Sequence, residues 1–138
     1  MNLKVILSEQ YKRAKNKKYN LSCILLGMLF FAMGVNGFFE IEKITFSPRG
    51  EFFLGYLEAN AWLWPMINFI QVVAGLLLLL RSYVPLAILL LGPIITNILA
   101  FHICLDLVRL PYILVMTFAY LYVAYIHRDL FKRFLKKR

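Results

Sequence analysis

Four apolar segments, each close to 20 residues long, dominate this sequence. They are Leu21–Phe39, Ala61–Leu80, Val84–Leu105 and Leu110–His127. A helix of about 20 residues rises about 30 Å, which is the thickness of the hydrocarbon core of a bilayer. Because 62% of the 138 residues are hydrophobic, little sequence remains for a soluble domain. We therefore predict an all-α integral membrane protein, with four transmembrane helices packed as an antiparallel bundle.

The chain divides into three parts that differ in charge and pattern. Residues 1–20 are a basic segment, residues 21–127 carry the transmembrane domain, and residues 128–138 are a second basic segment. The last part places apolar side chains opposite basic ones on a helix, which predicts an amphipathic extension at the membrane surface. Its apolar residues are Leu130, Phe131, Phe134 and Leu135. The first part repeats this pattern weakly, so an interfacial helix and a basic tail are both open there.

Basic residues gather at the two ends of the chain. The net charge is +9, and most lysines and arginines precede the first apolar segment or follow the last. Basic flanks mark the cytoplasmic side of a membrane protein, and four spans return both termini to one side. We therefore expect both termini in the cytoplasm and the loop of residues 40–60 outside. The headgroups of the lipid bilayer account for the charge, so we expect no nucleic-acid partner.

Polar side chains within the apolar segments lie toward the predicted external side. Trp64, Asn68 and Gln71 form one helical stripe of the second segment, and Asn97 lies on the third. An unpaired amide is costly in lipid, so these side chains must face protein or water. A short turn joins the two segments, and we therefore expect their polar stripes to meet.

Two interpretations of this polar half stay open. The first is hydrogen bonding between helices, worth about 0.6 kcal/mol per pair. The second is a pocket that opens outward and binds a small amphipathic ligand, a quinone or a lipid, with no resident cofactor. The predicted ligand-binding residues are Asn36, Trp64, Asn68, Gln71, Asn97 and His102.

Pro93 interrupts the third segment and predicts a bend. Its ring lacks an amide hydrogen and clashes with the carbonyl of Leu89, which frees a backbone acceptor. In lipid that acceptor needs a polar partner, so the bend should turn toward Asn68 or Gln71. We expect Asn97 to point inward there, beside a cavity open only to the outside.

His102 and Asp106 lie one helical turn apart, so the carboxylate can orient the imidazole as in a proton shuttle or half of a metal site. A solvated helix end has the same composition, and we expect both groups at a wet rim. The other histidine, His127, lies on the cytoplasmic side. Nucleophile–base pairs and glycine-rich phosphate loops are absent from the sequence. We predict no metal site, no catalytic residue and no enzyme activity of the chain on its own.

The loop of residues 40–60 carries Phe52, Phe53 and Tyr56 at helical spacing. Aromatic side chains at this height typically form the interfacial belt of a membrane protein. A short helix that covers the mouth of the bundle is the alternative.

Four features occur together along the chain: VNGFF (Val35–Phe39), the aromatic loop, GLLLLLRSYVPLAILLLGPIITNILAFH (Gly75–His102) and Asp106. This combination resembles the DoxX family, in particular its small four-span bacterial members, over roughly residues 21–127. The resemblance implies a four-helix protein of the bacterial cytoplasmic (inner) membrane. Relatives often carry a glutamate where this chain has Gln71, and an amide cannot exchange a proton as a carboxylate does.

Two functions are therefore expected. The first is a non-catalytic membrane subunit, or a binder of a small amphipathic ligand in the outward-facing pocket. The second is a membrane subunit of a redox system that links oxidation of sulfur compounds to quinone. That alternative follows from the resemblance, because the family is named after a subunit of a thiosulfate:quinone oxidoreductase. Hydroxyls on the last segment favour contact with headgroups, a membrane protein partner or a homo-oligomer: Tyr120, Tyr122 and Tyr125.

Overall fold

The computed structural model describes residues 2–128 and 131–132, with side chains for all of these except residues 6–15. Within this part of the chain all regular secondary structure is helical, and there is no strand. The elements are α1 (Leu3–Phe39), α2 (Pro48–Glu58), α3 (Leu63–Leu79), α4 (Val84–Cys104), the 3-10 turn η1 (Leu107–Arg109) and α5 (Leu110–Ile126). The prediction of an all-α protein is confirmed.

Three helical stretches are long and apolar enough to cross a membrane. They are Asn16–Phe39, Val84–Cys104 and Leu107–Ile126. The remaining predicted span corresponds to α3, which has 17 residues and rises about 25 Å. It adds a fourth crossing when α2 and α3 are taken as one broken span, bent by 95°. The structure thus supports a multi-pass membrane protein with three to four crossings.

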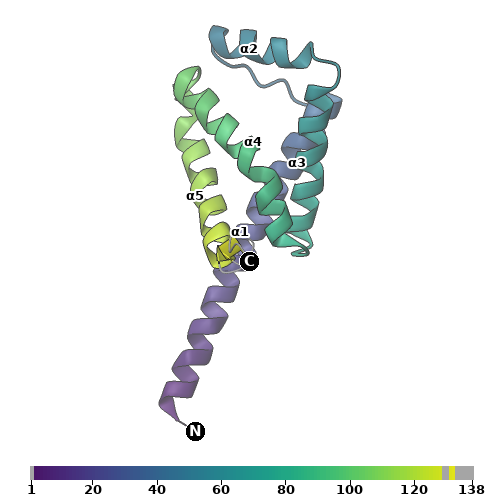
Figure 1. The fold of residues 1–138 in the computed structure, drawn as a ribbon. Coiled ribbons are helices and arrows are strands. Elements are labelled where there is room, and N and C mark those ends of the chain that lie inside the picture. The colour runs from purple at the N-terminus through teal and green to yellow at the C-terminus, as the bar shows by residue number, and fades with distance from the viewer. Residues whose placement is uncertain (1, 129–130, 133–138) are drawn as a thin grey trace.

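The long helices form two pairs that lean apart toward one end (Figure 1). Helix α3 runs alongside α1, whereas α4 leaves α3 at their short turn and crosses diagonally to meet the start of α5. Helix α2 lies across the opened end, at 95° to α3. We call this end the α2 end, and the opposite end, where α3 and α4 are joined, the turn end.

Glycines allow the backbones of α1 and α3 to approach closely. A Cβ atom added to Gly75 would lie 2.6 Å from the backbone nitrogen of Phe31, and one added to Gly34 would lie 2.7 Å from the carbonyl oxygen of Asn68. In a membrane, where lipid is as apolar as leucine, close backbone packing of this kind drives helix association. The contact between α1 and α3 is accordingly the most extensive in the structure.

The hydrophobic core lies toward the turn end and draws on all four long helices. Its buried members are Cys23, Leu26 and Phe30 from α1, Ala74 and Leu78 from α3, Val84, Ala87, Ile88, Leu91, Ile94 and Ile95 from α4, and Met116 and Val123 from α5. Most polar contacts between helices and loops therefore lie at the α2 end.

The structure describes most of the N-terminal basic segment but little of the C-terminal one. Helix α1 runs unbroken from Leu3 through the first span, and its N-terminal half projects beyond the other helices (Figure 1). The basic segment is therefore helical from Leu3 onward, and an interfacial position for residues 1–20 stays a prediction. The predicted amphipathic extension of residues 128–138 lies mostly outside the described residues.

We expect Gly75→Ala to destabilise the protein, because the new methyl group would meet backbone atoms that cannot move aside. Overpacking of this kind costs about 1–3 kcal/mol. Thermal unfolding in detergent, followed by circular dichroism, measures the effect. The matched control is Gly55→Ala on α2, where an added Cβ meets no atom within 4 Å. Equal unfolding temperatures for the two variants would contradict the close packing of α1 on α3.

Candidate functional site

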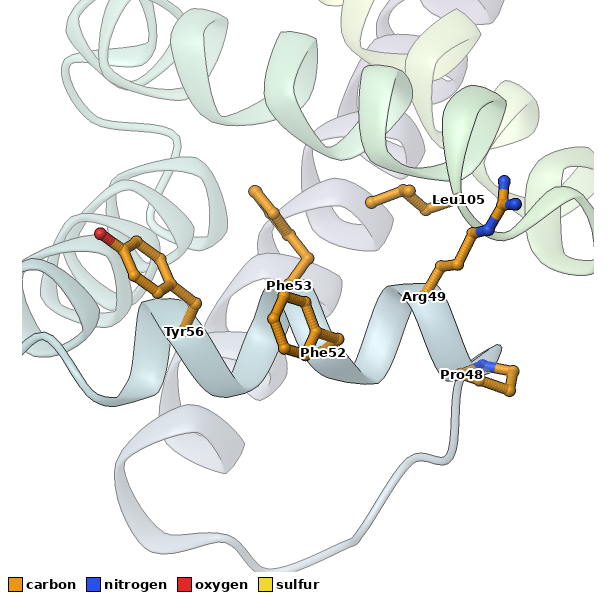
Figure 2. A pocket seen from close by; sticks show the side chains of 6 residues that line it. All are labelled: Pro48, Arg49, Phe52, Phe53, Tyr56 and Leu105. Atoms are coloured by element: carbon orange, nitrogen blue, oxygen red, sulfur yellow. The ribbon is translucent and has the colours of Figure 1, made fainter.

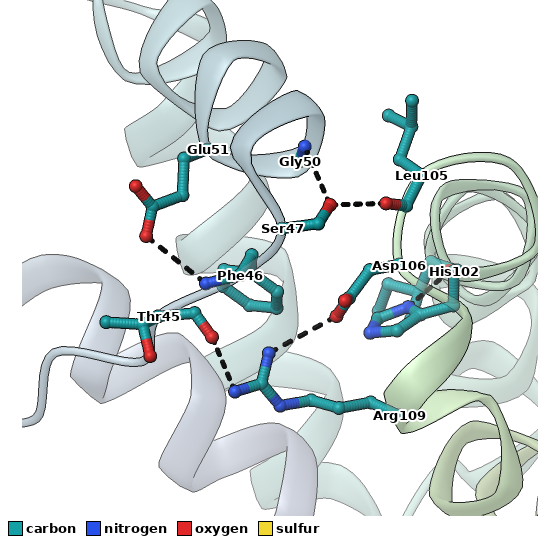
Figure 3. A network of polar contacts seen from close by, with 10 residues as sticks. Thr45, Phe46, Ser47, Gly50, Glu51, His102, Leu105, Asp106 and Arg109 are labelled. Carbon is teal, nitrogen blue, oxygen red and sulfur yellow. Dashed lines mark hydrogen bonds and ion pairs between the residues drawn. The ribbon is translucent and has the colours of Figure 1, made fainter.

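At the α2 end, Arg109 connects two segments of the chain that are far apart in the sequence (Figure 3). Its Nη1 donates to Asp106 Oδ2 at 3.2 Å, and its Nη2 donates to the carbonyl oxygen of Thr45 at 2.5 Å. The guanidinium also lies over the ring of Phe46, 4.6 Å from the centroid. One cation therefore ties the loop before α2 to the turn between α4 and α5.

Ser47 fixes the start of α2 against α4. Its Oγ accepts a hydrogen bond from the backbone nitrogen of Gly50 at 3.2 Å, as an N-cap residue does, and donates to the carbonyl oxygen of Leu105. Glu51 Oε1 accepts from the backbone nitrogen of Phe46 at 3.3 Å. We refer to the set of contacts around Thr45, Phe46, Ser47, His102, Leu105, Asp106 and Arg109 as the polar junction.

His102 and Asp106 belong to this junction, and both are buried, with exposed fractions of 6% and 4%. His102 donates from Nδ1 to the carbonyl oxygen of Ile98 at 2.8 Å. Its ring packs edge-on against Phe101, with centroids 5.0 Å apart. Among the described residues no hydrogen bond joins the imidazole to Asp106, whose partner is Arg109. The expectation that both groups are solvated at the rim of the bundle is therefore wrong, because side chains from the loop before α2 cover this helix end.

Asn36 and Trp64 secure the end of α1. The Asn36 amide holds the backbone of Glu42, accepting from its nitrogen at 2.7 Å and donating to its oxygen at 3.0 Å. Trp64 Nε1 donates to the carbonyl oxygen of Gly37 at 3.2 Å. Both predicted ligand-binding side chains thus satisfy backbone groups of the protein itself.

Asn68 and Gln71 are buried on α3, with exposed fractions of 2% and 5%. The Asn68 side chain occupies the space that Gly37 leaves open, where an added Cβ would lie 2.2 Å from Asn68 Oδ1. Its Nδ2 is buried and has no hydrogen-bond partner among the described residues. The polar stripe of α3 therefore faces α1 rather than α4.

Asn97 does not join this group. Its side chain is exposed on α4, and Figure 1 shows the α2 ends of α3 and α4 well apart. The expected meeting of the polar stripes, with Asn97 pointing inward toward Asn68 or Gln71, is wrong. The reason is that the glycines of α1 place α3 against α1, while α4 leans toward α5. Asn97 therefore lies apart from Trp64 and Asn68, whose side chains both contact Gly37.

The region around Pro93 obtains its polar partner from α5. The hydroxyl of Tyr120 donates to the carbonyl oxygen of Ile88 at 2.8 Å, one residue before the carbonyl of Leu89 that proline leaves without its usual donor. A polar group near this position was expected from Asn68 or Gln71. The structure instead places a hydroxyl of α5 on the neighbouring carbonyl of Ile88.

An open hollow of about 740 Å³ lies beside α2, between that helix and the end of α4 (Figure 2). Its lining is apolar except for one guanidinium and one phenol: Pro48, Arg49, Phe52, Phe53, Tyr56 and Leu105. Phe53 also packs on Phe101 of α4, with centroids 5.8 Å apart. The aromatic spacing in the loop was the sequence signal for this helix, but neither Arg49 nor Leu105 was predicted as a site residue.

The turn end has its own polar contact. The hydroxyl of Tyr19 on α1 lies 2.8 Å from Nε2 of His127, just after α5, and the rings pack edge-on at 5.6 Å. Burial lowers the pKa of His127 from its ordinary value of 6.5. The neutral imidazole therefore accepts the hydrogen bond from the phenol and joins the first and last long helices.

Comparisons with known proteins add no relative. No family model, no curated protein and no solved structure matches this chain. In the part of the chain that the structure describes, no group of three or more His, Cys, Asp or Glu side chains is arranged to hold a metal ion.

We expect Arg109→Gln to loosen the polar junction, because it leaves the buried Asp106 carboxylate without its ion pair. Removing one partner of a fully buried pair costs about 3–5 kcal/mol, and the partial exposure of Arg109 places the expected loss below that. Hydrogen exchange of residues 45–51 should become faster. The control is Lys43→Gln in the same loop, which removes an exposed charge. Unchanged exchange in the Arg109 variant would show that the junction does not hold α2.

Acidification is expected to weaken the contact between Tyr19 and His127. Because the folded-state pKa of His127 is lowered, the stabilisation is complete above the ordinary pKa of 6.5 and is lost as the pH falls through this value toward the folded-state pKa. Unfolding temperatures measured from about pH 8 to about pH 5 should decline, and they should decline less in His127→Gln. The same decline in both proteins would rule out His127 as its source.

Proposed function

We propose that this chain is a four-span protein of the bacterial cytoplasmic membrane that binds an amphipathic molecule, a quinone or a lipid, at its extracytoplasmic face. It acts as a binding protein or a membrane subunit and is not an enzyme on its own. Both termini lie in the cytoplasm in this proposal, so the α2 end is outside. The basic residues at the ends of the chain support this orientation.

The hollow beside α2 is the observation on which the binding proposal depends. Ligand sites are typically concave and apolar, with a few polar groups that set the orientation of the ligand. Here Phe52 and Tyr56 supply apolar surface, and Arg49 supplies one charge at the edge. This site replaces the pocket expected between the second and third spans. Membership of the DoxX family stays a proposal that rests on the resemblance of residues 75–102.

Photolabelling tests this function. Purified protein in detergent is irradiated with a fatty acid that carries a diazirine in its chain, and labelled positions are located by mass spectrometry of peptides. We expect labels on residues 48–56 and a clear decrease in Phe52→Ala, because Phe52 is 83% exposed in the hollow. Competition with a short-chain ubiquinone distinguishes a quinone site from a site for acyl chains.

The matched control is Phe118→Ala on α5, which removes an equally large and largely exposed side chain outside the hollow. It should leave the labelling of residues 48–56 unchanged. Equal labelling of these residues in wild type, Phe52→Ala and a double variant that also carries Tyr56→Ala would contradict the proposed binding site.

A further inference from the structure

We propose that the hollow beside α2 is a site for one anionic phospholipid, with an acyl chain along Phe52 and Tyr56 and the phosphate at Arg49. The assignment rests on the proposed function and specifies the ligand of that site. It commits to a phospholipid of the surrounding membrane.

The position of α2 fits a ligand taken from the bilayer. Helix α2 is bent by 95° from α3, so it lies along the membrane surface when α3 crosses the membrane. Helix α3 rises about 25 Å, which is close to the thickness of the hydrocarbon core, about 30 Å. Its α2 end therefore lies near the boundary between acyl chains and headgroups. A hollow at this height is reached directly by lipid molecules.

The surface of the hollow is almost wholly hydrocarbon, and the charged group among the residues that line it belongs to Arg49. Arg49, Phe52 and Tyr56 are spaced so that they share one side of α2 (Figure 2). Arg49 and Tyr56 are seven residues apart, or about 10 Å along the helix. Leu105 completes the apolar surface from the end of α4. The hollow thus offers a surface for hydrocarbon, and the exposed Arg49 places a positive charge at its edge.

The charge on Arg49 is available for a ligand, unlike that of its neighbour Arg109. Arg109 is engaged by Asp106, Thr45 and Phe46 in the polar junction (Figure 3). Arg49 has no ion pair or hydrogen bond with any described residue, and Glu51, two residues further along, is bonded to the loop backbone. A guanidinium binds a phosphate through paired, charge-assisted hydrogen bonds. A ligand with a negatively charged headgroup therefore suits this site better than a neutral one.

The test uses the full-length protein in phosphatidylcholine vesicles that contain a trace of photoactivatable lipid with a diazirine in one acyl chain. Phosphatidylglycerol and phosphatidylcholine probes with the same chain are compared, and labels on residues 48–56 are counted by mass spectrometry. One basic residue near the surface changes the affinity for an anionic lipid by about five-fold. We expect wild type to favour the phosphatidylglycerol probe by about that factor, and Arg49→Gln to label equally with both. Lys43→Gln removes an exposed charge from the same loop but outside the hollow, so it should keep the preference.

Different results of this experiment would overturn different parts of the assignment. Equal labelling of wild type by both probes would overturn the anionic headgroup while leaving an amphipathic ligand in place. Absence of labels on residues 48–56 with either probe would overturn this assignment, and loss of fatty-acid labelling as well would overturn the proposed function. A photoreactive phenylalanine analogue at position 52 tests for other occupants. If it links mainly to a second copy of the chain, the hollow is a protein interface and the lipid assignment is wrong.

Discussion

The close contact between α1 and α3 determines where the other helices lie. Gly34 and Gly75 remove the side chains that would separate the two backbones, and Asn68 fills the space that Gly37 leaves. The polar face of α3 is therefore turned toward α1, and it offers α4 no polar partner. Helix α4 meets α3 near their turn and then leans toward α5 (Figure 1). The opened end is the place where α2 lies.

Periodicity in the sequence identified helices and faces, but it could not identify the helix that each face contacts. Trp64, Asn68 and Gln71 were recognised as one stripe, and they do share one side of α3. The second and third segments are neighbours in the chain, which favoured contact between them. The first segment can also pack against this face of the second, because its glycines allow a close approach. The distance between the two helix backbones, which the sequence does not give, decides whether α1 or α4 contacts that face. Gly27 and Gly34 carried that signal, because an added Cβ at either position would meet α3 within 3 Å.

The polar contacts of single residues show the same limit. Pro93 predicted a polar group at the carbonyl of Leu89, and the structure places the Tyr120 hydroxyl on the neighbouring carbonyl of Ile88. Chain order gave no reason to place α5 there. The sequence also carried no sign of the contacts of Asn36 and Ser47, because their partners are backbone atoms of the loop and of Leu105. Every residue has backbone groups of this kind, so the sequence cannot indicate which of them a side chain will bind. The folded structure is needed to identify them.

The polar junction holds α2 in place, as the proposed binding site beside this helix requires. Helix α2 has 11 residues, which is too short to be stable alone in water. Ser47 caps it, and Arg109 anchors the loop before it, so its position is set before any ligand arrives. Little ordering free energy is then needed on binding, because the apolar side chains and Arg49 already project from a fixed helix. The two arginines therefore have different surroundings. The Arg109 guanidinium is engaged within the protein and holds the loop before α2, whereas that of Arg49 is exposed beside the hollow, where the proposed anionic headgroup would bind.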